Sequence, residues 1–319
     1  MKEIMRQIIR KLNECKKIAI TSHIRPDGDS IGSGLALYLV LKRLGKEVKY
    51  LNKDELKPPL IKLPYVDVIE YRDIYPEEFD CVILIECSSE KRSGQKNLEN
   101  YFRILIDHHK SNEENVEINW VKPEESAVAI MIYELLKELN VKIDKDIAFL
   151  LYCGIISDTG GFRFTNTNSK ALRVASELIE LGADPIKANT ILFEGYPAEK
   201  VRLMGDVFST LRIENNGKVA YIFMLKEFLE KNGLSDVETE DIVTIVRGIE
   251  NIKLVVFFKQ MDDEKFRVSV RSRDEVDSSK LSEYFGGGGH LHAAGFFIEG
   301  EKDKIFKLVK VKVNEFYKL

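Results

Sequence analysis

One short turn near the start of the chain combines a histidine with two aspartates. The segment 22–33 reads SHIRPDGDSIGS and contains His23, Asp27 and Asp29. It follows an apolar run that predicts a buried strand and precedes a helical pattern from Ile31 to Leu44. Three metal-ligating side chains beside a helix N-terminus, which attracts anions, indicate a metal-plus-phosphate site. The alternative is that Asp29 simply caps the helix.

Two further apolar runs, 81–85 and 102–106, predict central parallel strands and end in residues of the same kinds. These residues are Glu86 after the first run and Asp107, His108 and His109 after the second, while Asp158 closes a helical pattern. The carboxyl ends of parallel strands meet at one sheet edge, so we expect these side chains in one cleft. Burying several carboxylates together is costly unless cations offset their charge. Mixed histidine and carboxylate ligands favour Mn²⁺, Mg²⁺, Fe²⁺, Co²⁺ or Zn²⁺, and two such ions about 3.5–4 Å apart activate water for phosphoester hydrolysis.

A glycine run near the end of the chain predicts a second anion site. Four consecutive residues, Gly286, Gly287, Gly288 and Gly289, directly precede His290. Such a run is costly in a packed helix or strand, and it allows backbone amides to form a nest for anions. Arg271 and Arg273, at the end of a neighbouring predicted strand, offer bidentate phosphate contacts, and His290 can bind phosphate or stack on a base. The alternative is a flexible hairpin loop.

Together these motifs resemble those of the DHH phosphoesterase superfamily. The resemblance rests on His23-x-x-x-Asp27-x-Asp29, the acidic residue Glu86, Asp107-His108-His109-x-Ser111-Asn112 and Asp158-Thr159-Gly160. The run from Gly286 to Gly295, with Arg271-Ser272 upstream, resembles the DHH-associated C-terminal domain. The resemblance covers essentially the whole chain, and size and layout are most similar to the group of nanoRNases and 3′-phosphoadenosine-5′-phosphate phosphatases.

The resemblance implies two divalent cations, Mn²⁺ first, with Mg²⁺ or Co²⁺ as alternatives. It implies a first ion on His23, Asp27 and Glu86, and a second ion on Asp29, Glu86, His108 and Asp158. It also implies that Asp107 orients a ligand histidine and that His109 faces the scissile phosphate. One position departs from the family, which usually has aspartate where this chain has Glu86. The longer side chain keeps the charge needed to bridge two ions, but we expect the distance between the ions or the metal preference to shift.

The implied reaction is hydrolysis of oligonucleotides of roughly two to five residues to mononucleotides, with 3′-phosphoadenosine-5′-phosphate as a further substrate. The expected substrate contacts are Ser111, Asn112, Arg271, Ser272, Gly286, Gly287, Gly288, Gly289 and His290. Related alternatives are a cyclic or linear dinucleotide phosphodiesterase and a family II inorganic pyrophosphatase. An alternative from another class is a nucleotide- or RNA-binding protein without hydrolytic activity, if Glu86 impairs the site.

The elements that must position these residues alternate between strands and helices up to about residue 185. This alternation predicts an α/β fold with a doubly wound, mostly parallel sheet. The expected strands are 17–22, 47–51, 81–85 and 102–106, and the expected helices are 2–14, 31–44, 126–139, 144–156 and 169–182. A smaller α+β domain follows, with a hairpin formed by 255–260 and 267–271. We expect a catalytic domain at 1–190, linker helices at 191–207 and a substrate-binding domain at 208–319, with the active site in the cleft between the domains.

Composition restricts the class of ligand and the cellular location. The chain has 319 residues, 44% of them hydrophobic and 31% charged, with a net charge of −4. This charge weighs against tight binding to long duplex DNA but is compatible with short oligonucleotides. The N-terminus lacks the pattern of a signal peptide, and the longest apolar stretch, 147–156, is too short to span a membrane. Because the cysteines are scattered, we expect a cytoplasmic protein, and we expect no membrane partner. A homodimer is one assembly that the sequence allows.

Overall fold

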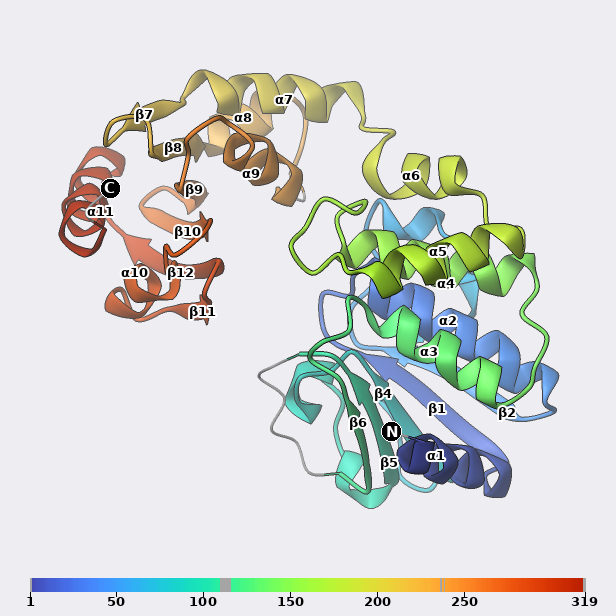
Figure 1. Ribbon diagram of the computed structural model, residues 1–319. Coiled ribbons are helices and arrows are strands. Elements are labelled where there is room, and N and C mark those ends of the chain that lie inside the picture. Colours follow the sequence, from blue (N-terminus) through green and yellow to red (C-terminus); the bar gives the residue numbers. More distant parts are fainter. Residues whose placement is uncertain (1, 110–115, 236, 238, 318–319) are drawn as a thin grey trace. The chain divides into compact units, whose positions relative to one another are not determined.

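The computed structural model describes residues 2–109, 116–235, 237 and 239–317. It divides into two compact units, Met1–Gly195 and Tyr196–Leu319 (Figure 1). The helices that we expected to form a linker belong to different units. Helix α6 (Pro185–Phe193) is part of the first unit, and α7 (Ala198–Ser209) is part of the second. The predicted substrate contacts Ser111 and Asn112 lie outside the described residues. Within the described ranges, every helix is too short or too polar to cross a membrane.

The first unit is built on a parallel sheet of six strands in the order β3-β2-β1-β4-β5-β6. The strands are β1 (Lys17–Ser22), β2 (Glu47–Asn52), β3 (Ile69–Tyr71), β4 (Cys81–Ile85), β5 (Phe102–Asp107) and β6 (Ile118–Val121). The order reverses between β1 and β4, which pair directly. Ligands of such sheets bind beyond the carboxyl ends of the strands at this reversal. The sequence analysis missed β3 and β6, because three or four residues at a sheet edge leave too short a pattern.

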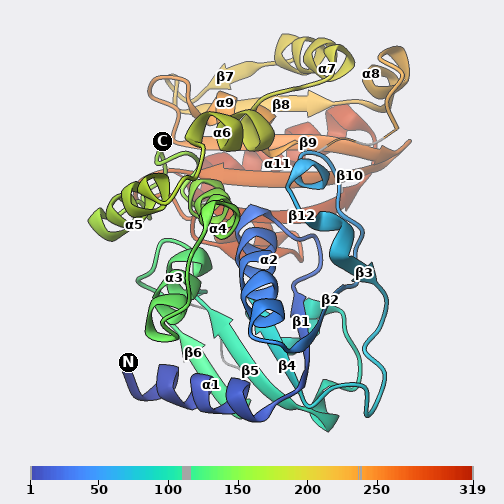
Figure 2. The ribbon, with the colours of Figure 1, turned by 90° about the vertical axis from the view of Figure 1, so that its right-hand side faces the viewer.

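Long helices cover one face of this sheet, as Figures 1 and 2 show. The helices of the unit, besides α6, are α1 (Lys2–Glu14), α2 (Gly28–Arg43), α3 (Val128–Glu138), α4 (Lys145–Asp158) and α5 (Ser169–Glu180). Side chains such as Ile83 and Ile104 pack in the core beneath the helices, whereas Val82 and Leu84 pack in a smaller core on the other face. Because the central strands are buried on both faces, they read as continuous apolar runs. The α/β prediction is confirmed, although loops and a short 3₁₀ helix, rather than long helices, supply the smaller core.

Helices α2 and α4 approach each other closely at positions that only glycine fits. A Cβ atom at Gly32 would lie 2.4 Å from the carbonyl oxygen of Leu150, and one at Gly154 would lie 2.8 Å from Oδ1 of Asp29. Both distances are shorter than van der Waals contact, so a methyl group would push the helices apart. The close approach brings the start of α2 beside the end of α4, where Asp158 lies.

The second unit is built on a mixed sheet in the order β11-β12-β10-β9-β8-β7, in which only β8 and β9 run parallel among the described pairs. Helices α10 and α11 pack on one face, and α7, α8 and α9 pack on the other. The strands are β7 (Arg212–Glu214), β8 (Val219–Met224), β9 (Leu254–Asp262), β10 (Lys265–Ser272), β11 (Gly288–His290) and β12 (Ala293–Glu299); the remaining helices are α8 (Lys226–Lys231), α9 (Glu240–Arg247), α10 (Ser279–Tyr284) and α11 (Lys302–Phe316). The predicted hairpin is confirmed as β9 and β10.

Part of the glycine run forms an edge strand, although we expected such a run to be costly in a strand and considered a flexible hairpin loop as the alternative. Strand β11 pairs with β12, and Gly289 lies opposite Ala294. A Cβ atom at Gly289 would lie 2.4 Å from Cα of Ala294, and φ is 149° there, so this position excludes side chains. Gly286 retains a left-handed φ of 75°. The described structure does not include the side chain of His290.

Candidate metal centre

Asp27 caps helix α2 and also faces His23. Its Oδ1 atom accepts hydrogen bonds from the amides of Asp29 and Ser30, at 3.1 and 2.9 Å, and its own amide donates to Oγ of Ser30 at 3.0 Å. This capping box fixes the turn between β1 and α2. The other oxygen, Oδ2, lies 3.8 Å from Nε2 of His23. The capping role that we considered for Asp29 therefore belongs to Asp27, which keeps one oxygen for the site.

Two histidines present the same ring nitrogen to the site. Nδ1 of His23 lies 2.8 Å from the carbonyl oxygen of Ile24, and Nδ1 of His108 lies 3.0 Å from that of Glu125. Because a carbonyl oxygen only accepts hydrogen bonds, Nδ1 must carry the proton in each ring. In the neutral ring Nε2 then keeps its lone pair, which is the form of imidazole that binds a metal ion.

Glu86 lies between these two imidazoles, in the turn that follows β4. Its Oε2 atom is 4.0 Å from Nε2 of His23, and its Oε1 atom is 3.7 Å from Nε2 of His108. Two ligands of one ion, each bound at about 2.1 Å, lie about 3–4 Å apart. This spacing would allow each oxygen of Glu86 to bind a different ion together with a different histidine. The backbone of Glu86 has a φ of 56°, a conformation that is unfavourable for glutamate and typical of functional turns.

The donor atoms of the predicted ligands form two sets of three residues. Atoms of Asp29, His108 and Asp158 lie within 4.8 Å of one another, and so do atoms of His23, Asp27 and Glu86. In the first set, Nε2 of His108 is 3.6 Å from Oδ2 of Asp158. All six predicted metal ligands thus come together in the first unit.

Asp29 is fully buried and is held by the start of helix α3. Its oxygens accept hydrogen bonds from the amides of Val128 and Ala129, at 2.5 and 2.9 Å. Hydrogen bonds from a helix N-terminus stabilise the ionised carboxylate. The amide of Val128 uses only one lone pair of Oδ2, so this oxygen can still bind a cation with the other.

Asp107 is also fully buried, and it pairs with His109. Nδ1 of His109 lies 2.7 Å from Oδ1 of Asp107. His108 takes its orientation from the carbonyl group of Glu125 instead. A ring nitrogen of His109 also lies within 4.8 Å of donor atoms of Glu86 and His108. His109 therefore stands beside the two sets with its ring held by a buried carboxylate.

Crowding of carboxylates shifts their acidity. Burial, together with the charges of Asp27, Asp29 and Asp158, raises the pKa of Glu86 well above its ordinary value. Burial also raises the pKa of Asp158 to about 8, against the opposing charge of His108. Without a cation, the site therefore holds protons that reduce the repulsion. The excess of carboxylates, the two oriented imidazoles and the spacing fit a pair of divalent cations.

Residues outside the predicted set support the ligands. Oγ of Ser33 donates to Oδ1 of Asp29 at 3.0 Å, and Nδ2 of Asn166 lies 3.1 Å from the carbonyl oxygen of Asp158 and 3.3 Å from its Oδ2. Together with the carbonyl group of Glu125, these contacts were missed by the sequence analysis. Ser33, one turn of helix after Asp29, is the contact that helical spacing could have indicated.

In the second unit, two predicted substrate contacts have partners within the unit. Arg271 donates from Nε and Nη2 to the two oxygens of Glu240, at 3.0 and 2.7 Å. Ser272 is buried, and its hydroxyl lies 2.6 Å from the carbonyl oxygen of Val276 and 3.1 Å from that of Leu291. Arg271 can exchange its carboxylate partner for a phosphate, whereas the hydroxyl of Ser272 faces the interior.

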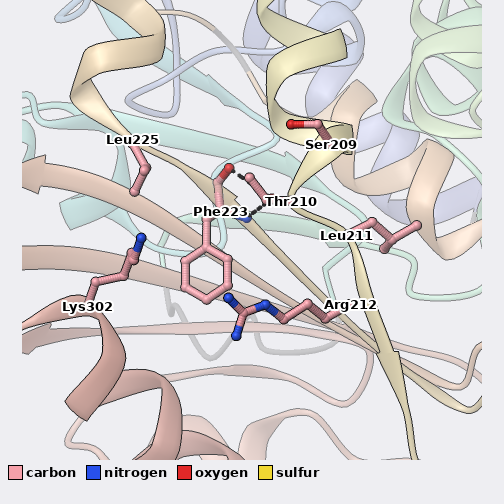
Figure 3. Close-up of a pocket in the computed structure, with 7 residues that line it drawn as sticks. All are labelled: Ser209, Thr210, Leu211, Arg212, Phe223, Leu225 and Lys302. Atoms are coloured by element: carbon pink, nitrogen blue, oxygen red, sulfur yellow. Dashed lines mark hydrogen bonds between the residues drawn. The ribbon is translucent and has the colours of Figure 1, made fainter.

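A surface pocket of about 250 Å³ also lies in the second unit (Figure 3). Figure 3 shows the aromatic ring of Phe223 between Lys302 and Arg212. The lining residues are Ser209, Thr210, Leu211, Arg212, Phe223, Leu225 and Lys302. Because this set includes none of the predicted substrate contacts, the pocket is a separate feature of the unit.

Comparison with known proteins gives the same division of the chain. Residues 17–155 match the model of the DHH family, N-terminal domain, and residues 216–315 match the DHHA1 domain. The bifunctional oligoribonuclease and PAP phosphatase NrnA of Thermus thermophilus is 33% identical over 310 residues, which are 93% of this chain and 89% of that protein. NrnA of Bacillus subtilis is 31% identical over 307 residues, 94% of this chain and 95% of that protein. An exopolyphosphatase-related protein from Bacteroides fragilis has a similar structure, with a TM-score of 0.91 and 28% identity over 98% of this chain and 97% of that one.

Proposed function

Since this chain belongs to the DHH family of phosphoesterases, we propose that it hydrolyses short oligonucleotides to mononucleotides at a two-metal site. We propose 3′-phosphoadenosine-5′-phosphate as a second substrate, because the NrnA relatives are named for both activities. The observation that carries the proposal is the place of Glu86, with one oxygen near each of two oriented imidazoles.

The first ion would be held by His23, Asp27 and Glu86, and the second by Asp29, Glu86, His108 and Asp158. When bound, such ions supply an activated water and neutralise the charge that develops on the phosphoryl group. Mn²⁺ accepts both imidazole and carboxylate ligands and is our first choice, with Mg²⁺ or Co²⁺ as alternatives. The chain contributes the fixed orientation of the donors, which reduces the reorganisation needed during the reaction.

His109 is the residue that we propose to contact the reacting phosphate. Its Nδ1 atom donates to Asp107, and in the imidazolium form of the ring Nε2 also carries a proton, which can be donated to a phosphoryl oxygen or transferred to the leaving oxygen. The buried carboxylate of Asp107 keeps the ring in one orientation. Asp107 is thus a positioning residue for His109 in this proposal.

The second unit is proposed to hold the far end of the substrate. Arg271 would exchange Glu240 for a phosphate, while Gly286–Gly289 and His290 would contact the same end of the nucleotide. Ser272 would help only by fixing the loop around it. The net charge of −4 favours short ligands over long duplex DNA.

A substrate panel tests the proposal. The full-length protein with Mn²⁺ is incubated with di- to pentanucleotides, a 24-residue RNA, 3′-phosphoadenosine-5′-phosphate, a cyclic dinucleotide and pyrophosphate. We expect mononucleotides from the short RNAs and loss of activity after chelation. The variant Asp158→Asn should lose turnover while its near-ultraviolet circular dichroism is unchanged. Intact dinucleotides and intact 3′-phosphoadenosine-5′-phosphate would overturn the proposal, and binding without turnover would favour a nucleotide-binding protein.

A further inference from the structure

One segment of the first unit supports the ligands proposed for the second ion. The segment 122–129 connects β6 to α3. The carbonyl group of its Glu125 orients His108, and its amides at Val128 and Ala129 hold the carboxylate of Asp29. Two ligands from different parts of the sequence therefore depend on the same eight residues.

Asn166 connects the third ligand to this segment. Its Nδ2 atom lies 3.1 Å from the carbonyl oxygen of Ser126 and 3.1 Å from that of Asp158. Oγ of Ser126 donates in turn to the carbonyl oxygen of Asn166 at 2.5 Å. A displacement of the segment 122–129 would thus move or release Asp29, His108 and Asp158. These are the three proposed ligands that the second ion does not share with the first.

Four charged side chains hold the segment in place. Nζ of Lys122 lies 2.7 Å from Oε2 of Glu134 on α3 and 3.4 Å from Oε1 of Glu125. Lys170 on α5 pairs with Glu125 and lies 2.5 Å from Oε1 of Glu134. The side chains of Lys122 and Glu125 are only 6% and 5% exposed. Buried charges of this kind depend on their partners, and removal of one partner leaves another charge unpaired in a poorly solvated place.

We infer that the ion-pair cluster of Lys122, Glu125, Glu134 and Lys170 is a positioning device for the second ion site. This inference rests on the proposed two-metal function. The cluster fixes Glu125, whose carbonyl group sets the direction of His108 and whose chain leads into the amides that hold Asp29. A lysine on α5, a helix that supplies none of the proposed ligands, thereby controls how well the second ion binds.

The first ion offers an internal comparison. His23 is oriented by the carbonyl oxygen of the next residue, Ile24, and Asp27 is fixed by the capping box with Ser30. These supports lie within the turn between β1 and α2 and are independent of the segment 122–129. Damage to the cluster is therefore expected to weaken one ion site and to spare the other.

The test measures binding of Mn²⁺ alone to full-length protein by calorimetry. Lys170→Met is made in a His23→Ala background, which leaves the second site, and in an Asp158→Ala background, which leaves the first. We expect the second site to lose affinity about 10–100-fold, the usual effect of removing support from a metal ligand. The first site should change less than about twofold, and Lys170→Arg should restore most of the lost affinity because it keeps the charge.

Lys137→Met is the matched control. Lys137 also joins α3 to α5, with Nζ 3.3 Å from Oε2 of Glu177, but both side chains are solvent-exposed. This variant should leave both affinities unchanged. If Lys170→Met fails to fold, Glu134→Gln must weaken the second site alone.

Unchanged affinity at the second site, or equal losses at both sites, would overturn the inference. The titrations use no substrate, so wild-type protein that binds two ions but cleaves no oligonucleotide would overturn the proposed function and leave the inference intact.

Discussion

The two units prepare their predicted binding residues in different ways. In the first unit, the supporting contacts of His108 and Asp27 occupy one atom of the side chain and leave another for the site: Nδ1 of His108 donates to a carbonyl oxygen, and Oδ1 of Asp27 caps a helix. In the second unit, Nε and Nη2, which form one edge of the guanidinium group of Arg271, both donate to Glu240. The first unit thus brings carboxylates that repel one another together before a cation binds. In the second unit, Glu240 neutralises Arg271 until an anion replaces this carboxylate.

The largest expected effect concerns the bridge of the first unit. Glu86→Gln keeps the size of the side chain but removes the charge that both ions would share in the proposed site. We expect kcat/KM on a dinucleotide to fall on the order of 10³-fold, since an amide cannot offset the charge of two cations. Steady-state kinetics with saturating Mn²⁺ measure this loss.

Glu86→Asp is the matched control for the bridge. It keeps the charge, and aspartate adopts a left-handed backbone such as the φ of 56° at this position more readily than glutamate does. Activity within about tenfold of wild type is expected, because the length of the bridging side chain is altered and its charge is not. Wild-type activity in Glu86→Gln would show that Glu86 does not bridge two ions.

The pH dependence of metal binding tests whether the first unit really holds mutually repelling groups. Burial raises the pKa of Asp158 to about 8, and the pKa values of Glu86 and Asp29 are also raised, chiefly by burial. The folded, metal-free protein therefore binds more protons than the unfolded chain between about pH 4 and pH 8. Its stability should fall as pH rises through this window, because the unfolded chain loses those protons first.

Mn²⁺ should reverse this trend, because it replaces the protons. Thermal unfolding at pH 6 and pH 8, with and without Mn²⁺, measures the effect. We expect the metal to raise Tm more at pH 8 than at pH 6, and calorimetry in two buffers should detect proton release on binding. A metal-induced shift that is equal at both pH values would mean that the carboxylates are already ionised without metal.

The sequence predicted that the polar residues of the proposed metal centre would come together, because most of them follow strands that are buried on both faces. Such strands read as continuous apolar runs, so the ends of β1, β4 and β5 were clear, and their polar residues marked one sheet edge. The supporting contacts were not predictable in this way. Asn166 and Asp158 meet Ser126 only after α3, α4 and the loop that follows them have packed, and a carbonyl group such as that of Glu125 carries no side-chain signature.

The second unit was less predictable for a different physical reason. A glycine run indicates that backbone atoms approach closely, but it does not say what they approach. At Gly289 the neighbour is the backbone of Ala294 in β12, and an edge strand forms where we had expected a strand to be costly. The ion pair between Arg271 and Glu240 could not be predicted from the sequence either, because the two residues lie 31 positions apart on different elements.

The smallest expected effect tests the role of this pair. If Arg271 receives the substrate phosphate, Arg271→Ala should raise KM for a trinucleotide about tenfold or more, with less change in kcat, because it removes a bidentate contact. Glu240→Gln should act in the opposite direction. An exposed ion pair is worth about 0.2–1 kcal/mol, so release of Arg271 should lower KM by up to about fivefold. Initial rates at low ionic strength resolve this difference, which salt should reduce. If both variants raise KM, the pair is a structural salt bridge. Glu240 would then support Arg271 as the contacts of the first unit support the metal ligands, and would not be a partner that the substrate replaces.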